Sequence, residues 1–196
     1  MSSVSNLQPA LFVPHGAPTF ALRPGAAGAA LTAAALDLAQ PRAIVIVSPH
    51  WDTAVPTVGF AERPETIHDF WGFPEELYTL RYPATGCREA AEDVVRALTA
   101  AGLPAEQDPQ RGLDHGAWVP LRLMFPDADV PVIPLSLQSQ AGTAHHLRLG
   151  QALAGLASGG FLVIASGNLT HNLRDYQMAQ RNGGQTPAYV RAFSDW

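Results

Sequence analysis

Three histidines in this sequence closely follow short apolar runs, and imidazoles placed in this way could bind a metal ion or transfer a proton. Histidine is the commonest metal ligand among side chains and suits both zinc and non-haem iron, and it is also the usual acid or base near neutral pH. These residues alone do not distinguish metal binding from proton transfer. Any single histidine among them could also have a purely structural role. The runs and their histidines are Leu11–Val13 with His15, Ala43–Val47 with His50, and Phe161–Ala165 with His171.

The apolar runs have the length and composition of β-strands that are buried on both faces. Two further runs of this kind are Thr57–Phe60 and Val132–Leu137, and patterns typical of helices lie between the runs. This alternation predicts an α/β protein with a mixed or mostly parallel central sheet that is flanked by helices on both faces. The expected helices are about Ala26–Leu38, Arg88–Ala101, Trp118–Met124 and Ala144–Leu156.

The predicted sheet explains why the histidines follow strands. The carboxyl ends of parallel strands lie at one edge of a sheet, and open α/β folds bind their ligands at that edge. We therefore expect His15, His50 and His171 to converge there, although they are far apart in the sequence.

Two loops carry further candidates for the same site. The stretch RGLDHGAWVP places His115 next to Asp114, and the stretch IHDFWGFPEELY contains His68, Phe70 and Trp71. Aromatic side chains in a loop with Gly and Pro can line a flat apolar pocket, although they can equally form a small core of the loop itself. The remaining pair of histidines, at positions 145 and 146, begins a predicted helix, and we interpret both as solvated or associated with the helix cap.

Composition excludes several classes of function. The chain has 196 residues, 47% of them apolar and 15% charged, which is typical of a single globular domain, here residues 1–196. With a net charge of -5 and no basic run, we expect neither a nucleic-acid partner nor binding to a membrane surface. Cys87 is the only cysteine, so an internal disulfide is excluded, and the start MSSVSNLQPA lacks the features of a signal peptide. These features predict a cytoplasmic protein; self-association stays open.

The last residues, TPAYVRAFSDW, have the pattern of a helix that stops early. Thr186 is a plausible N-cap with Pro187 at the first helical position, and an apolar stripe follows at helical spacing. Because the chain stops on an aromatic residue without a capping glycine, we expect the domain to lack its C-terminal segment in this sequence. The alternative is a short terminal helix that packs on the core. The stripe consists of Tyr189, Val190, Phe193 and Trp196.

Taken together and in order, these motifs resemble the class III extradiol ring-cleavage dioxygenases, in particular the DOPA extradiol dioxygenase branch. The matching stretches run from residue 11 to residue 173, so the resemblance covers most of the chain. SPHW alone is a weak signal, whereas the ordered set is specific. The stretches are LFVPHGAPTFAL, IVIVSPHW, TIHDFWGFPEELYTLRYPATG, GLDHGAWVPL, PVIPLSLQ and VIASGNLTHNL.

The resemblance implies a role for each candidate residue. His15 and His50 correspond to two metal ligands of the family. His171 corresponds to a histidine near the metal that acts as acid or base and is sometimes counted as a ligand, and His115 to one that contacts the oxygens of the substrate. The loop with His68, Phe70 and Trp71 would lie over the substrate. The implied substrates are an aromatic diol (a catechol) and O2, and the implied cofactor is Fe(II), with Zn(II) as an inert substitute.

The resemblance also leaves one ligand missing. The family carries a further metal ligand, a histidine or a glutamate, in a C-terminal segment that we expect beyond Trp196. A local carboxylate, Asp114 or Asp52, is another candidate for this missing metal ligand. Two other functions use the same histidines: a zinc hydrolase that activates water, and a non-catalytic metal-binding or interaction protein like the Memo-type proteins, which share the fold.

Overall fold

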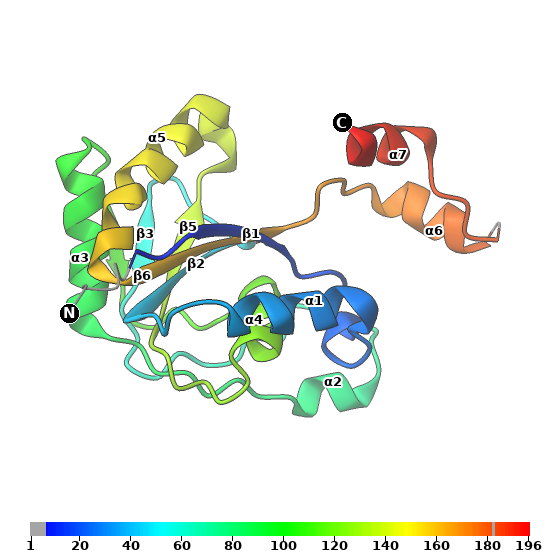
Figure 1. Cartoon of the computed structure of the whole chain (residues 1–196), viewed down its shortest axis with the longest axis horizontal. Coiled ribbons are helices and arrows are strands. Elements are labelled where there is room, and N and C mark those ends of the chain that lie inside the picture. Colours follow the sequence, from blue (N-terminus) through cyan, green and yellow to red (C-terminus); the bar gives the residue numbers. More distant parts are fainter. Residues whose placement is uncertain (1–6, 182) are drawn as a thin grey trace.

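The computed structural model describes residues 7–181 and 183–196. Residues 1–6, which belong to the stretch without signal-peptide features, lie outside the described residues. The described chain folds around one six-stranded sheet with helices on both faces (Figure 1). No helix in these two ranges is both long and apolar enough to cross a bilayer.

The sheet is mixed, as predicted. Its strand order is β1-β6-β2-β5-β3-β4, and the neighbours are parallel except for β3 and β5. The strand β4 was not predicted, because its three residues are polar and at most half-buried. The strands are β1 (Ala10–Pro14), β2 (Ala43–Asp52), β3 (Thr57–Gly59), β4 (Glu106–Asp108), β5 (Val132–Leu137) and β6 (Phe161–Gly167).

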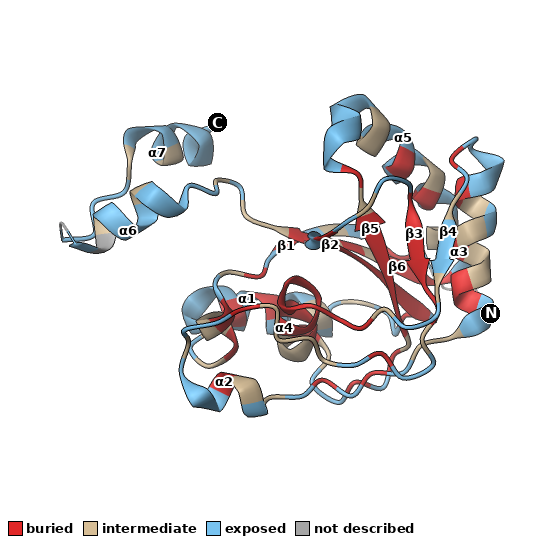
Figure 2. Cartoon of the chain, turned by 180° about the vertical axis from the view of Figure 1, so that it is seen from behind, coloured by how far each residue is buried: buried red, intermediate tan, exposed pale blue. Residues whose placement is uncertain are grey.

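Two apolar cores hold the sheet between its helix layers. Alternate residues of β2 point to opposite faces, so that Ile44 and Ile46 join one core while Val45 and Val47 join the other. The helices α1 (Gly25–Leu36) and α4 (His115–Met124) cover the first face, and α3 (Arg88–Ala100) and α5 (Gly142–Ala154) cover the second (Figure 2). Burial on both faces explains the continuous apolar runs in the sequence.

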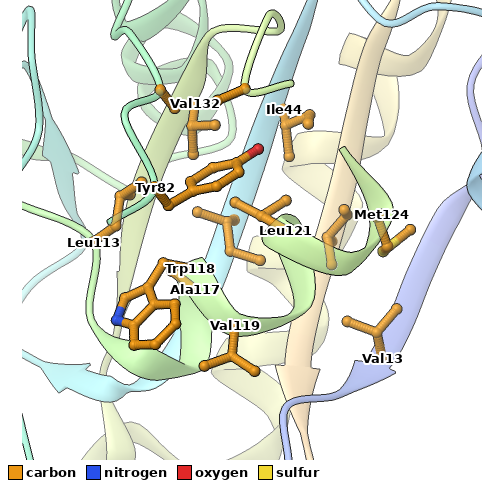
Figure 3. Packing of buried hydrophobic residues seen from close by; sticks show 14 of the residues in the cluster. Val13, Ile44, Tyr82, Leu113, Ala117, Trp118, Val119, Leu121, Met124 and Val132 are labelled. Atoms are coloured by element: carbon orange, nitrogen blue, oxygen red, sulfur yellow. The ribbon is translucent and has the colours of Figure 1, made fainter. Parts of the chain in front are cut away.

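Helix α4 is the most deeply buried of the helices. Trp118 and Leu121 are fully buried against the sheet, next to Ile44 and Tyr82 (Figure 3). The sequence predicts a helix only from residue 118, whereas α4 begins at His115. The earlier start comes from Asp114, whose carboxylate accepts a hydrogen bond from the backbone N–H of Ala117 and caps the helix.

The C-terminal part extends away from the sheet (Figure 1). It consists of α6 (Leu173–Arg181) and α7 (Ala188–Asp195). The expected cap by Thr186 is wrong: Pro187 is the N-cap, in an extended conformation, and no side chain caps the helix. The predicted apolar stripe does not pack on the core, since Trp196 is 96% exposed.

The remaining elements are short. Helix α2 (Glu75–Thr79) was not predicted, because one turn gives no detectable periodicity. In the described residues, 3-10 helices span Pro18–Ala21, Ser139–Ala141 and Gly155–Gly159.

Candidate metal centre

His15 is positioned by the pairing of two neighbouring strands. It follows β1 directly, and in the register of β1 with β6, Val13, two residues before His15, pairs with Ser166. The hydroxyl of Ser166 lies 3.2 Å from Nδ1 of His15, and the imidazole is 2% exposed. This contact at Nδ1 leaves Nε2 free to face other groups.

His50 lies in the irregular end of β2. The pairing of β2 with β5 is regular up to Val47 and resumes only at Asp52. Within this irregular stretch the backbone N–H of His50 donates to the hydroxyl of Ser48 at 3.2 Å. His50 therefore lies where β2 departs from regular pairing, and its side chain stays 31% exposed.

His115 is the first residue of α4, and its ring is held by a carboxylate. Its Nδ1 lies 2.9 Å from Oδ2 of Asp69, and its backbone N–H donates to Oδ1 of the same residue at 2.8 Å. Burial alone would raise the pKa of Asp69, but the hydrogen bonds from the His115 ring and backbone outweigh it and lower that pKa to about 2. Asp69 is therefore a carboxylate at neutral pH.

The three imidazoles form one compact group. One nitrogen from each of His15, His50 and His115 can be chosen so that all three lie within 4.8 Å of one another. The ring centroids are 4.0 to 5.4 Å apart. The predicted convergence of strand ends is thus present for His15 and His50, and the third member of the group comes from a helix.

The spacing of the nitrogens fits a metal ion. Nε2 of His15 lies 3.2 Å from Nε2 of His50. Two imidazole nitrogens bound to the same ion at the usual metal–nitrogen distance lie about 3.0–3.4 Å apart, depending on the angle at the metal. The distance between these two nitrogens is therefore the one that a shared ion requires.

The lowered pKa values of His15 and His50 also suit a metal. Burial, followed by the nearby His115 and His50, lowers the pKa of His15 to about 4. Burial and His115 likewise lower the pKa of His50. Both rings are therefore neutral at pH 7 and offer the lone pairs that metal binding requires.

The two carboxylates proposed as substitute ligands are engaged elsewhere. Asp114 accepts hydrogen bonds from Ser48 at 2.6 Å and from Arg111 at 2.5 Å. Asp52 accepts from the backbone N–H and the hydroxyl of Ser139. Neither belongs to the group of metal-ligating atoms among the described residues.

The three imidazoles face a pocket of about 700 Å³. Its walls come from the loop after β1, the aromatic loop before α2, and the segment from Asn168 to Val190. Phe70 and Trp71, both predicted at the substrate, line it; Phe70 is buried, whereas Trp71 is 86% exposed. The pocket is large enough for a single aromatic ring with its substituents.

The other predicted histidines take different positions. His171 lines the same pocket but stands outside the compact group among the described residues. His68 is not among the described lining residues; its Nε2 lies 3.1 Å from the backbone oxygen of Leu80. His145 and His146 are half-buried and hydrogen-bond to Gln138 and to the backbone of Gly142, at the start of α5.

Sequence reasoning missed Asp69. It stands between two residues that were singled out, His68 and Phe70, but a lone aspartate in an aromatic loop gave no periodic or spacing signal. Only the contact with His115, 46 positions away, reveals its role.

A comparison with protein families matches residues 23–193 to a family described as the catalytic LigB subunit of aromatic ring-opening dioxygenase. His50, His115 and His171 lie inside the matched range, and His15 lies before it.

Curated relatives agree with that match. The chain is 42% identical over 175 residues to a 4,5-DOPA dioxygenase extradiol from Beta vulgaris. This alignment covers 87% of this chain and 65% of the relative. It is 42% identical over 201 residues to the protein of the same name from Escherichia coli strain K12, covering 98% of this chain and 72% of the relative. The chain therefore spans about two-thirds of the length of these relatives.

A solved structure has a similar fold. The crystal structure of an uncharacterized protein from Escherichia coli K12 matches with a TM-score of 0.68 and 35% sequence identity. The match covers 85% of this chain and 62% of that protein.

Proposed function

Because this chain belongs to the family of catalytic LigB subunits of aromatic ring-opening dioxygenases, we propose that it is a metal-dependent extradiol dioxygenase that opens the ring of a catechol with O2. The observation that carries the proposal is the group of three imidazoles at a pocket with an aromatic wall. Relatives named 4,5-DOPA dioxygenase extradiol support a substituted catechol such as DOPA as the substrate class.

The proposed ligands are His15 and His50. His115 completes the group of three imidazoles, and its proposed role is the one that the resemblance implies, contact with the oxygens of the substrate. The lowered pKa values of His15 and His50 and the distance between their Nε2 atoms support the assignment of these two ligands. When bound, a redox metal such as Fe(II) would allow O2 to react with the catechol, which side chains alone cannot do. Zn(II) would fit the same nitrogens but has no redox chemistry.

The other residues of the pocket bind and orient the substrate in this proposal. Phe70 lies against the ring of His115, with centroids 5.8 Å apart, and forms the rigid part of the aromatic wall. The exposed indole of Trp71 can cover a planar ring from the solvent side. A flat aromatic substrate fits between such side chains better than an aliphatic one.

His171 is the proposed acid and base. It lines the pocket outside the compact group, so its imidazole can accept the proton of a catechol hydroxyl without serving as a ligand. The same nitrogen can return that proton to an oxygen of the substrate later in the reaction. Proton transfer by a positioned histidine typically contributes about 10²–10⁴ in rate.

The test is oxygen uptake by the Fe(II)-loaded protein. The protein is loaded under anaerobic conditions and mixed with DOPA, caffeate or 4-methylcatechol in air-saturated buffer. We expect one O2 consumed for each catechol, together with the visible absorption of a ring-opened semialdehyde; the Zn(II)-loaded protein is the control and should consume none. A hydrolase would consume no O2 with any metal, so the absence of uptake with all three catechols would overturn the proposal.

A further inference from the structure

The acidic side chains of the pocket could select substrates by charge. Asp69 and Asp175 belong to the lining that the structure describes, and no arginine does. The sequence contains no lysine. A cleft lined by charge of one sign attracts ligands of the opposite sign. Such a pocket can therefore distinguish catechols that share the same ring but carry substituents of different charge.

Asp69 is already engaged by the protein. Its Oδ1 accepts the backbone N–H of His115 at 2.8 Å, and its Oδ2 lies 2.9 Å from Nδ1 of the same residue. Both oxygens therefore have a partner at the start of α4. Asp175 is left as the carboxylate of the described lining that can act on a substrate.

Asp175 lies in the first turn of α6 and is half-buried. Its Oδ2 accepts a 3.1 Å hydrogen bond from the side-chain amide of Asn172. Desolvation, and then the neighbouring carboxylate of Asp175, raises the pKa of the Tyr189 hydroxyl in α7, so these two side chains lie close together. A carboxylate offers about four acceptor sites, so these neighbours leave room for the N–H groups of a ligand.

The surroundings of Asp175 suit a cationic group. Tyr176 and Tyr189 line the same pocket. Aromatic rings attract an ammonium group, and a carboxylate adds an ion pair with hydrogen bonds. Among the described lining residues there is no arginine that could bind an anionic substituent in return. Arg191, close by in α7, donates to the backbone oxygen of Thr186 at 2.8 Å.

The position of α6 determines which part of a substrate Asp175 can meet. The three imidazoles lie at the strand ends and at the start of α4, whereas α6 belongs to the C-terminal part that extends away from the sheet (Figure 1). Both lie on the wall of one pocket of about 700 Å³. A catechol whose hydroxyls face the imidazoles would therefore present its substituent, and not its hydroxyls, to Asp175.

Helix capping is the other explanation for Asp175. The backbone N–H of Asp175 donates to Oδ1 of Asn172 at 3.1 Å, which is the usual contact of an N-cap residue, and an acidic residue in the first turn is favourable for the helix dipole. These contacts do not need the negative charge to face a pocket. The variant Asp175→Asn separates the two roles, because it keeps the backbone N–H and an oxygen that can accept from Asn172 but removes the charge.

We propose that Asp175 binds a cationic amine on the substrate, so that the pocket prefers a catechol with an ammonium group to one with a carboxylate; the catechol part of this statement rests on the proposed function. Three ligands with the same two-carbon link to the ring test it. They are dopamine, the neutral alcohol 3,4-dihydroxyphenylethanol, and 3,4-dihydroxyphenylpropanoate. At pH 7 the first is a cation and the last an anion.

Affinity is measured without turnover. Calorimetric titration of the Zn(II)-loaded protein under nitrogen gives Kd for each ligand. We expect dopamine to bind about fivefold more tightly than the alcohol and about tenfold or more above the propanoate, as one partly exposed ion pair allows. Tighter or equal binding of the propanoate would overturn the proposal, as would a failure of all three ligands to bind.

Asp195→Asn is the matched control. It removes the same charge from α7, and Asp195 is not among the described lining residues. The ratio of the dopamine and propanoate affinities should stay as in the wild type in Asp195→Asn and in Asp175→Glu, which keeps the charge. It should fall to within about threefold in Asp175→Asn. An unchanged ratio in Asp175→Asn, or an equal loss in Asp175→Glu, means that the charge of Asp175 does not select the substrate.

The proposal can fail separately from the proposed function. Oxygen uptake by the Fe(II)-loaded protein with the neutral alcohol, without a preference for dopamine, would overturn the role of Asp175 and keep the dioxygenase. A preference for dopamine without oxygen uptake with any of the three ligands would do the reverse. If Asp175→Asn does not fold, the wild type decides: its preference should shrink from about 0.05 M to about 0.5 M NaCl, and a preference that does not depend on salt contradicts an ion pair.

Discussion

The hydroxyl of Ser48 donates a 2.6 Å hydrogen bond to Oδ1 of Asp114, and both residues are buried. This bond joins the irregular end of β2 to the start of α4, and it therefore fixes the distance between His50 and His115. The other oxygen of Asp114 is paired with Arg111 at 2.5 Å. A buried carboxylate with a guanidinium partner is costly to disturb, so this contact between β2 and α4 is a rigid support for the three imidazoles.

The contact between Ser48 and Asp114 leaves no room for a side chain at Gly116. A Cβ there would lie 2.3 Å from Oγ of Ser48 and 2.8 Å from Cδ2 of His50. We expect Gly116→Ala to destabilise the protein by about 1–3 kcal/mol, as overpacking typically does, and to weaken metal binding by displacing His50. Urea unfolding and Zn(II) titration measure the two effects.

Gly150→Ala is the control for helix propensity. Gly150 also lies inside a helix, α5, but an added Cβ there meets nothing within 4 Å. Alanine should stabilise that helix by up to about 1 kcal/mol, so the two variants should change the free energy of unfolding in opposite directions. Equal stabilisation by both would mean that the space around Gly116 is not restricted.

Removal of one proposed ligand should abolish metal binding. His50→Ala takes away the nitrogen that lies 3.2 Å from Nε2 of His15. We expect less than a tenth of the wild-type zinc content by elemental analysis after dialysis, because two remaining imidazoles bind weakly. His146→Ala, at the start of α5, is the matched histidine control, and zinc content equal to wild type in His50→Ala would remove His50 from the ligand set.

Substitution of His171 should reduce turnover but leave metal binding unchanged. It lines the pocket but is not part of the compact group of described ligand atoms. We expect His171→Ala to keep its metal within twofold and to lose about 10²–10⁴ in kcat, the usual contribution of a general acid or base. A variant that has lost its metal would identify His171 as a ligand instead, and one with wild-type turnover would exclude it from proton transfer.

The sequence predicted most of the sheet because of how its strands are buried. The continuous apolar runs of β1, β2, β5 and β6 follow directly from burial on two faces, and the strand ends place His15 and His50 correctly at one edge. Strand β4 and helix α2 are too short to produce a pattern. Helix α6 was also not predicted, and its apolar residues Leu173 and Met178 are largely exposed, so burial left no apolar run there.

The site was harder to predict because its supports are single contacts between distant residues. His115 was expected in a loop, since the apolar pattern of α4 begins at Trp118 and the capping by Asp114 leaves no periodic trace. Asp69 acts through a contact that depends on how a loop lies beside that helix. Such contacts depend on the tertiary arrangement, so they cannot be predicted from the sequence around either residue.

Acid should destabilise the metal-free protein between pH 6.5 and 4. Burial and the neighbouring imidazoles lower the folded-state pKa of His15 from 6.5 to about 4, so the unfolded chain takes up the proton first as the pH falls. The contribution of His15 is therefore complete above pH 6.5 and is lost as the pH falls toward 4. Urea midpoints of chelator-treated protein at pH 7, 5.5 and 4 should fall for wild type and fall less for His15→Gln. Parallel pH profiles of the two proteins would contradict this reading.

Alkali should destabilise the protein through Tyr82. Burial, aided by the charge of Asp129, raises the pKa of the Tyr82 hydroxyl well above its usual value, and this hydroxyl donates to the backbone oxygen of Phe125 at 3.0 Å. A raised folded-state pKa means that stability is complete below about pH 10 and is lost as the pH rises above it, when the unfolded chain releases the proton first. The chain contains no lysine to titrate in the same range.

The substitution Tyr82→Phe tests this prediction. It should lower the free energy of unfolding by about 1 kcal/mol at pH 7 through the lost hydrogen bond. In thermal unfolding, the stability of this variant should decline less steeply than that of the wild type between pH 9 and about 11. Tyr176→Phe, which changes an exposed tyrosine, should keep the wild-type decline. If Tyr82→Phe declines as steeply as both other proteins, ionisation of the buried hydroxyl is not what limits stability in alkali.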